Sequence, residues 1–205
     1  FIYFYHEFIN YKMKRIVVFC GSSLGFNPVY KEAAIELGNY FAKNKIGLVY
    51  GGGKIGMMGI LADTILDHNG EVIGVIPKLL EKEEVVHAGV EEMIVCKKMS
   101  ERKVIMSKLI NGYITLPGGF GTLDELFEAL TLNQLHIEQK PVGLLNINGF
   151  FDGVLLQLDK MVEEGYLKQT NRDMLLIGTS VEELMQKINN YKALEIGHII
   201  NKVVR

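Results

Sequence analysis

Short apolar runs alternate with longer stretches of helical periodicity along the chain, and this alternation restricts the possible folds more than any other feature. Several of the runs are continuous in Val, Ile and Leu, which is typical of parallel strands buried on both faces. The predicted strands are residues 16–20, 47–50, 72–76, 92–96, 112–116, 142–146 and 174–177. The predicted helices are residues 28–43, 57–68, 101–110, 123–135, 149–164 and 181–190.

This order of elements predicts a single doubly wound, Rossmann-like α/β domain, with a mostly parallel sheet of about seven strands and helices on both faces. The length of 205 residues suits one domain, and no repeat, linker or low-complexity stretch divides it. We expect residues 14–194 to form this domain. Residues 1–13 are then an N-terminal extension of unknown role, and residues 195–205 a C-terminal tail.

Composition narrows the possible partners. A formal net charge of -2 and a pI of about 6.3 give no electrostatic reason to expect nucleic acid. No apolar run approaches the roughly 20 residues that a membrane-spanning helix needs, so no membrane partner is expected. Cys20 and Cys96 each end an apolar run without a CxxC spacing, which favours reduced, buried thiols in a cytoplasmic protein. His87 and His136 are isolated, and we expect structural or surface roles for them and no metal site.

Residues 117–125 read Pro-Gly-Gly-Phe-Gly-Thr-Leu-Asp-Glu, between a predicted strand and a predicted helix. A glycine turn that leads into a helix N-terminus directs unpaired amides and the positive end of the helix dipole at one point, which predicts a phosphate site. The dipole should keep Glu125 ionised, as the stabilisation of an oxocarbenium-like centre requires. Thr122 and Glu125 also match a capping box, in which Glu125 only satisfies an amide at the helix start. The two roles are compatible.

Two earlier glycine-containing turns should lie at the same edge of the sheet. The first, at residues 21–23, offers the hydroxyl of Ser22, although such turns are often rich in Gly and Ser for steric reasons alone. The second, at residues 51–59, contains a G-x-G-x-x-G pattern, but it follows the second strand, and its ribose partner would be Glu71, which begins a strand. A mononucleotide near Gly52 and Gly53, or tight helix packing, explains this turn better than NAD.

A basic cluster lies where the third predicted helix begins, at Lys97, Lys98, Arg102 and Lys103. Its plain interpretation is a solvated helix face. The alternative is that Arg102 reaches the anion site, where its guanidinium can pair with a carboxylate or a phosphate. Glu84 belongs to an acidic run whose plain interpretation is surface charge.

Together these motifs resemble the LONELY GUY (LOG) family, which is often labelled "lysine decarboxylase family". The family signatures are an Arg-Lys helix start followed by Pro-Gly-Gly-x-Gly-Thr-x-x-Glu, and this chain has Arg102-Lys103 followed by residues 117–125. The resemblance extends to residues 50–59 and 140–146 and covers roughly residues 14–190. Departures are Ser100, where many members have His, Lys98 in place of an acidic or small residue, and His136 in place of a glycine.

The resemblance implies hydrolysis of the N-glycosidic bond of a cytokinin riboside 5′-monophosphate or AMP, without a metal or organic cofactor. Arg102 and Glu125 would be the catalytic pair. The implied and predicted substrate-binding residues are Ser22, Gly52, Gly53, Glu84, Lys103, Gly118, Gly119, Gly121, Thr122 and Thr131. A homodimer with the site near the subunit interface is expected.

Two other functions remain open at this point. A non-catalytic nucleotide sensor or carrier could use the same fold, although a pure binder would not need both Arg102 and Glu125. A decarboxylase would generally use a lysine that binds pyridoxal phosphate, and no local sequence feature indicates such a site. We therefore expect a phosphoribohydrolase and not a lysine decarboxylase.

Overall fold

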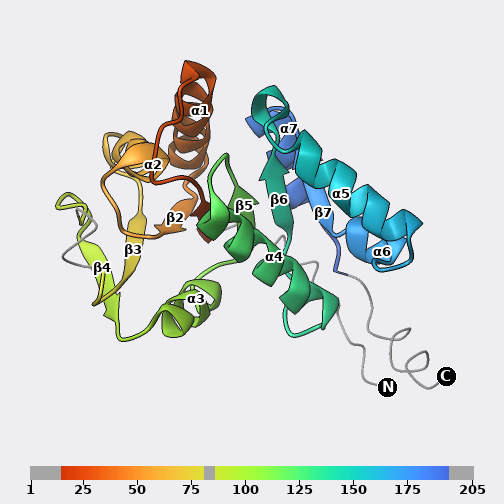
Figure 1. The fold of residues 1–205 in the computed structure, drawn as a ribbon. Helices are drawn as coiled ribbons and strands as arrows, with labels where there is room; N and C mark the ends of the chain where they lie inside the picture. The colour runs from red at the N-terminus through yellow and green to blue at the C-terminus, as the bar shows by residue number, and fades with distance from the viewer. Residues whose placement is uncertain (1–14, 81–85, 194–205) are drawn as a thin grey trace, which may run out of the picture.

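A seven-stranded sheet forms the centre of the computed structural model, which describes residues 15–80 and 86–193 (Figure 1). Every pairing between its strands is parallel, and the order is β4-β3-β2-β1-β5-β6-β7. The strands are β1 (Arg15–Phe19), β2 (Gly47–Tyr50), β3 (Val72–Pro77), β4 (Glu92–Cys96), β5 (Gly112–Thr115), β6 (Val142–Leu145) and β7 (Leu175–Gly178). The predicted doubly wound fold is confirmed. The predictions for residues 1–13, residues 195–205 and Glu84 lie outside the described residues.

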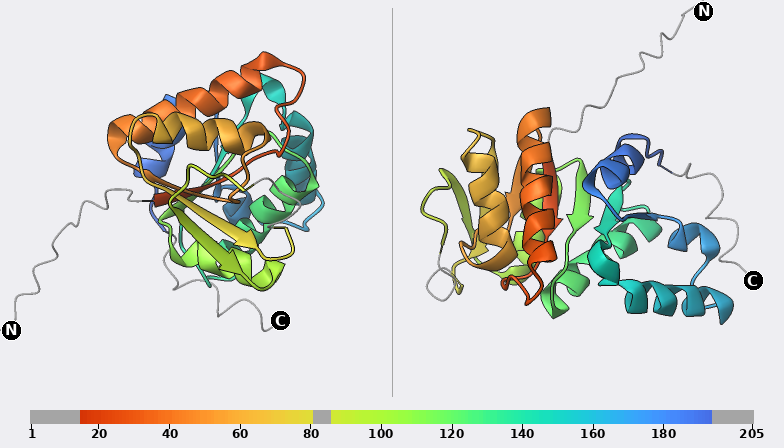
Figure 2. Two further views of the ribbon diagram at one scale, coloured as in Figure 1. Left: turned by 90° about the vertical axis from the view of Figure 1, so that its left-hand side faces the viewer. Right: turned by 90° about the horizontal axis from the view of Figure 1, so that it is seen from above.

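Helices cover both faces of the sheet, as predicted. One face packs against α1 (Pro28–Asn44), α2 (Gly56–Leu66) and α7 (Val181–Asn189). The other packs against α3 (Met99–Lys108), α4 (Phe120–Gln134) and α5 (Asp152–Glu163). Figure 2 shows α1 and α2 on the side of the sheet opposite α3. In the described residues no helix is both long and apolar enough to span a membrane.

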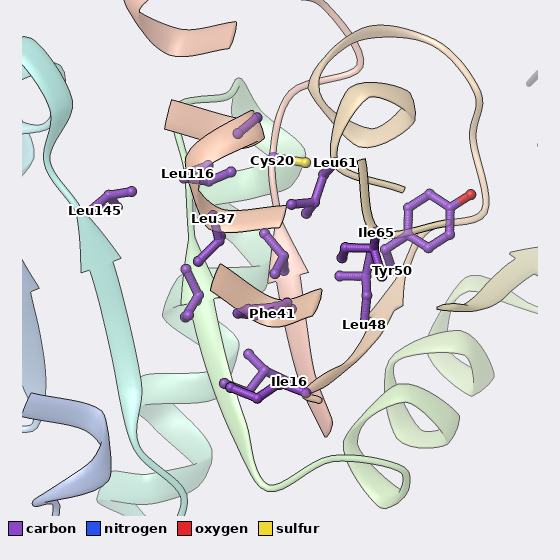
Figure 3. Close-up of a cluster of buried hydrophobic side chains, with 14 of the residues drawn as sticks. Ile16, Cys20, Leu37, Phe41, Leu48, Tyr50, Leu61, Ile65, Leu116 and Leu145 are labelled. Carbon is purple, nitrogen blue, oxygen red and sulfur yellow. The ribbon is translucent and has the colours of Figure 1, made fainter. Parts of the chain in front are cut away.

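The continuous apolar strands are explained by these two layers, because each strand supplies side chains to both. In β1, Ile16 and Val18 enter the core on the side of α1, whereas Val17 and Phe19 enter the core on the side of α3 and α4. Figure 3 shows the first of these cores, in which side chains of α1 and α2 meet those of the strands. A strand with a polar face could not occupy this position.

The strand order reverses between β1 and β5, and the glycine-containing turns gather at this point. The amide of Gly21, after β1, donates to the carbonyl of Pro117, after β5, at 3.0 Å. The amide of Met57, at the start of α2, donates to the carbonyl of Gly21 at 3.1 Å. The turns that follow β1, β2 and β5 are therefore connected directly, as expected for a ligand site at the switch in strand order.

Some helix boundaries differ from the prediction. Helix α4 begins at Phe120, three residues before the predicted start, and α3 begins at Met99 instead of residue 101. A short 3-10 helix, η1 (Ile147–Gly149), and the helix α6 (Gln169–Arg172) were not predicted. Side chains cap α1 and α7: Asn27 Oδ1 accepts from the Val29 amide at 3.1 Å, and Ser180 Oγ accepts from the Glu183 amide at 3.3 Å.

Candidate active site

The N-terminus of α4 presents a group of unpaired amides. Gly119 is the N-cap residue and has no side chain to cap the helix, so the first turn keeps its N–H groups free. No acceptor for the amides of residues 119–122 occurs within the described part of the chain. The capping-box interpretation is wrong, because Thr122 lies inside the first turn and Glu125 accepts no amide of the helix start there.

The glycines of this turn differ in what an added side chain would meet. A Cβ at Gly118 would lie 2.8 Å from the Gly21 amide nitrogen and would also overlap the Thr122 hydroxyl, so close packing requires glycine there. A Cβ at Gly119 or Gly121 would meet no protein atom within 4 Å. Protein packing therefore does not require these two glycines. They leave open space beside the free amides, where a bound anion can approach the backbone closely.

A cavity of about 300 Å³ opens between the turns that follow β1 and β5. Ser22 and Ser23 line one side and the Pro117–Gly119 segment lines the other. The remaining lining residues are Gly21, Leu24, Gly25, Tyr30, Met57 and Phe150. This volume is at the lower end of the range for small-molecule sites. The cavity thus brings the predicted residues Ser22, Gly118 and Gly119 to one place.

Arg102 is buried, whereas Lys97 and Lys98 of the same basic cluster are not. Its side chain is only 7% exposed, and its Nε donates to the Val75 carbonyl of β3 at 2.9 Å. The guanidinium also lies beside Gly51, where an added Cβ would overlap Nη2. Lys97 and Lys98 are exposed. The solvated-face interpretation therefore holds for the two lysines and is wrong for Arg102. The sequence motifs gave no sign that Gly51 and Val75 are neighbours of Arg102.

Glu125 lies one helical turn beyond the free amides, in a largely apolar setting. It borders a small cavity of about 20 Å³, whose walls include Phe19, Met106 and Leu132. Burial raises the pKa of Glu125 to about 7, although the charges of Arg102 and Lys103 act in the opposite direction. This raised pKa runs against the expectation that the helix dipole keeps Glu125 ionised. Desolvation outweighs the opposing charges of Arg102 and Lys103.

Arg102 and Glu125 are neighbours but do not form a direct ion pair. No ion pair within 4.0 Å joins them in the residues that the structure places, yet the charge of Arg102 lowers the pKa of Glu125. Arg102 belongs to α3, and its Nε is bonded to β3. Glu125 belongs to α4, which follows β5. The two groups therefore approach the switch point from opposite halves of the sheet.

Lys103 connects α3 with α4. Its Nζ donates to Asp124 Oδ2 at 2.7 Å and also bonds to Glu128 Oε2. These carboxylates lie on either side of Glu125 in α4. Lys103 thus already has two protein partners, and its contact with a substrate stays a prediction.

The other predicted residues are distributed unevenly. Gly52 and Gly53 are buried after β2, next to Gly51, and the Gly52 carbonyl accepts from the His87 amide at 3.0 Å. Thr131 is exposed on α4, and its hydroxyl donates to the Phe127 carbonyl at 2.7 Å. It lies twelve residues beyond the N-cap, or about 18 Å along the helix axis. The structure does not bring Thr131 to the anion site of the same chain.

Two further polar residues have structural partners. Glu71 pairs with Arg15, with Nε to Oε2 at 3.0 Å, at the end of the sheet opposite the glycine turns, so it is no ribose ligand. His87 is buried, and its Nδ1 accepts from the Gly89 amide at 3.2 Å. Its Nε2 must then carry the proton that it donates to Asp63 Oδ1 at 2.9 Å. The predicted structural role of His87 is confirmed.

The remaining groups named in the sequence predictions are the two cysteines and the possible metal ligands. Cys20 and Cys96 are both free and buried, as predicted. Within residues 15–80 and 86–193, no three side chains of the His, Cys, Asp or Glu type gather as a metal site.

Comparisons with known proteins identify relatives that match most of the chain. A family described as "Possible lysine decarboxylase" matches residues 58–188. The chain is 46% identical to the cytokinin riboside 5′-monophosphate phosphoribohydrolase LOG1 of Arabidopsis thaliana, over 89% of this chain and 86% of that protein. It is also 46% identical to the probable phosphoribohydrolase LOG6 of the same plant, over 88% of this chain and 90% of that protein.

A solved structure shares the fold at a lower sequence identity. The molybdenum cofactor binding protein from Rippkaea orientalis aligns with a TM-score of 0.64 and 25% identity, over 85% of this chain and 95% of that one. The higher identity to the phosphoribohydrolases extends over 89% of this chain, which is long enough to include both motifs of the site. The chain therefore belongs to the LOG family of phosphoribohydrolases.

Proposed function

We propose that the protein hydrolyses the N-glycosidic bond of a purine ribonucleoside 5′-monophosphate, either AMP or a cytokinin riboside 5′-monophosphate. The observation that carries this proposal is the row of unpaired amides at residues 119–122, with Glu125 one turn further along the same helix. Such a site can hold a phosphate at one end and act on an atom of the sugar at the other. The products are the free base and ribose 5-phosphate.

In this mechanism the phosphate fixes the sugar, and the carboxylate acts on it. The amides of Gly119 and Gly121 bind the 5′-phosphate in the open space beside them, with Gly118, Thr122 and Ser22 completing the pocket. Binding energy from the phosphate, which does not react, positions the anomeric carbon. Ionised Glu125 stabilises the positive charge that develops there and directs a water molecule. The hydroxyl of this water joins the anomeric carbon, and its proton ends on the released base.

Arg102 supports the ionised form of Glu125. Its buried charge lowers the pKa of the carboxyl group and offsets part of the desolvation. Its Nη atoms are free of the Val75 hydrogen bond, which uses Nε only, and they can donate to the substrate. The pair therefore combines a fixed cation with a carboxylate that can change its protonation state.

The test is product release by Glu125→Ala. We expect the parent chain to convert AMP or isopentenyladenosine monophosphate to free base and ribose 5-phosphate, measured by HPLC, and the folded variant to lose at least about 100-fold in kcat. Glu163→Gln, a change in an exposed glutamate of α5, is the matched control and should retain full activity. A folded Glu125→Ala protein with unchanged turnover contradicts the proposed role.

A non-catalytic nucleotide sensor or carrier is the alternative. The likeness to a molybdenum cofactor binding protein favours it, at 25% identity against 46% for the phosphoribohydrolases. It predicts nucleotide binding by calorimetry without any release of base from the parent chain.

We further propose that the protein is a cytoplasmic homodimer. The two free, buried cysteines support a reducing compartment. Phe127 on α4, and Leu135 and Ile137 after its end, are exposed apolar side chains within six residues of Thr131 in the sequence. Val104 on α3 is also exposed, and a second copy could cover these side chains. Such an interface would bring Thr131 of one copy close to the proposed active site of the other copy. Light scattering at several concentrations tests the dimer.

A further inference from the structure

We propose that Gly51 is a positioning residue, whose missing side chain provides the slot that holds the guanidinium of Arg102. This inference rests on the proposed function, because it concerns how one member of the catalytic pair is fixed. The sequence motifs include Gly51 only as part of the glycine turn at residues 51–59, and it lines neither of the two cavities described above.

One side of the slot is a backbone hydrogen bond. Arg102 Nε donates to the Val75 carbonyl at 2.9 Å, and Val75 lies within β3, a central strand of the sheet. Because the guanidinium is planar, a bond at Nε restricts the direction in which both terminal nitrogens point. Arg102 is only 7% exposed, so the surrounding protein leaves few other positions for its side chain. The hydrogen bond to β3 thus fixes the position of Arg102 Nε.

The other side of the slot is the bare Cα of Gly51, directly after β2. A Cβ there would come within less than 3.0 Å of Arg102 Nη2 and would lie 3.2 Å from Met58 Sδ. The backbone of Gly51 is not in the left-handed region, so alanine could adopt its conformation. The obstacles to a side chain are therefore the guanidinium and, to a smaller degree, the flexible end of Met58.

A side chain at the neighbouring Gly52 is disfavoured for a different reason. Gly52 has a φ of +81°, which disfavours any side chain, and its added Cβ would meet Met93 Sδ at 2.9 Å. Of these two, Gly51 alone borders a member of the catalytic pair. An alanine at position 51 should therefore displace Arg102 from its place between β2 and β3, while the backbone of the turn is kept.

The first experiment compares Gly51→Ala with Gly153→Ala. We expect Gly51→Ala to lower kcat for AMP or isopentenyladenosine monophosphate about 100-fold, the order of loss that a small misplacement of a catalytic group causes. KM should change less, because the amides that hold the phosphate are untouched. Gly153 lies in α5 with nothing within 4 Å of an added Cβ, so its variant should keep the parent kcat.

The second experiment is a double-mutant cycle with Arg102→Ala, in which kcat and the midpoint of thermal unfolding are both measured. We expect alanine at position 51 to reduce both quantities when Arg102 is present, and to have little effect once the guanidinium has been removed. Equal losses in both backgrounds would mean that something other than Arg102 excludes the side chain, and the inference would be wrong. It would also be wrong if Gly51→Ala matched the parent in both quantities.

The two readouts separate this inference from the proposed function. If the parent chain releases no base from any nucleotide, the proposed function fails, and the unfolding midpoints alone decide whether Arg102 and Gly51 are coupled. If the parent is active and the cycle is additive in both kcat and the unfolding midpoint, the proposed function is retained. The inference that Gly51 positions Arg102 is then wrong.

Discussion

At the scale of single residues, the protonation of Glu125 governs the proposed reaction. The pKa of this carboxyl is raised from 4.5 to about 7, chiefly by burial, and only the ionised form can stabilise a developing cation. We therefore expect kcat/KM to fall as the pH drops below about 7 and to level off above it. A pH–rate profile of the parent chain measures this. An acid limb near the ordinary value of a glutamate would contradict the raised pKa.

Stability should depend on the same proton in the opposite direction. Because the native state binds the Glu125 proton more tightly than the unfolded chain, the contribution is present at low pH and is lost as the pH rises through about 7. Glu125→Gln cannot ionise, so above pH 7 it should be more stable than the parent by roughly 1–3 kcal/mol. Urea unfolding at pH 5 and pH 8 checks this, and the gain should be much smaller at pH 5.

Gly121, which no protein side chain approaches, gives a third prediction at this scale. Gly121→Ala places a methyl group in a helical position where it meets no protein atom within 4 Å. We expect stability to rise by up to about 1 kcal/mol, because alanine favours the helix. The same methyl group should occupy the space of the phosphate and raise KM at least about tenfold. Initial rates of AMP hydrolysis and urea unfolding measure the two effects. A stabilised variant with the parent KM would place the phosphate elsewhere.

At the scale of elements, Lys103 holds α3 and α4 together at the site. Its side chain is 22% exposed, and its Nζ bonds both Asp124 and Glu128. Burial acts to lower the pKa of Lys103, but these two carboxylates raise it overall. Lys103→Met keeps the aliphatic stem and removes the charge. We expect it to destabilise the protein by about 1 kcal/mol and to lower kcat, because Arg102 and Glu125 lie on the two helices that it joins.

A matched control for Lys103 exists on α5. Lys160 also pairs with two carboxylates, Glu163 and Glu164, but these partners follow it by only three and four residues and join no second element of the site. Lys160→Met should leave kcat unchanged. Urea unfolding and HPLC of both variants check the comparison, and equal effects on kcat would show that loss of any lysine pair, rather than the link between α3 and α4, explains the result.

Element positions were largely predictable, and the exceptions have physical reasons. All seven predicted strands are present, since continuous apolar runs are a strong signal. The start of α4 was missed because Gly119 and Gly121 have weak helix preference and no side chain caps the turn. A weak start of this kind is consistent with a helix end that is completed by a ligand. The short elements η1 and α6 have too few residues for a periodic pattern.

At the scale of the whole molecule, the motifs were predictable and their relations were not. The sequence indicated an anion site at residues 117–122 from local order alone. It could not show that desolvation raises the pKa of Glu125, because the apolar walls come from β1 and α3 as well as α4. Nor could it connect Gly51 with Arg102, which meet only after β2, β3 and α3 have packed together. Tertiary contacts of this kind have no signature in one linear sequence.

The strand order also decides when, during synthesis, a pocket can exist. A ribosome releases β1 to β4 first, and in the complete sheet these strands are one contiguous half. The edge of β1 that β5 later covers is then open, and Pro117, which bonds Gly21, has not yet emerged. The turn that carries the proposed phosphate site can therefore form only after β5 has been synthesised. The exposed edge of β1 is a place where a chaperone, or a misfolded neighbour, can bind before the site is complete.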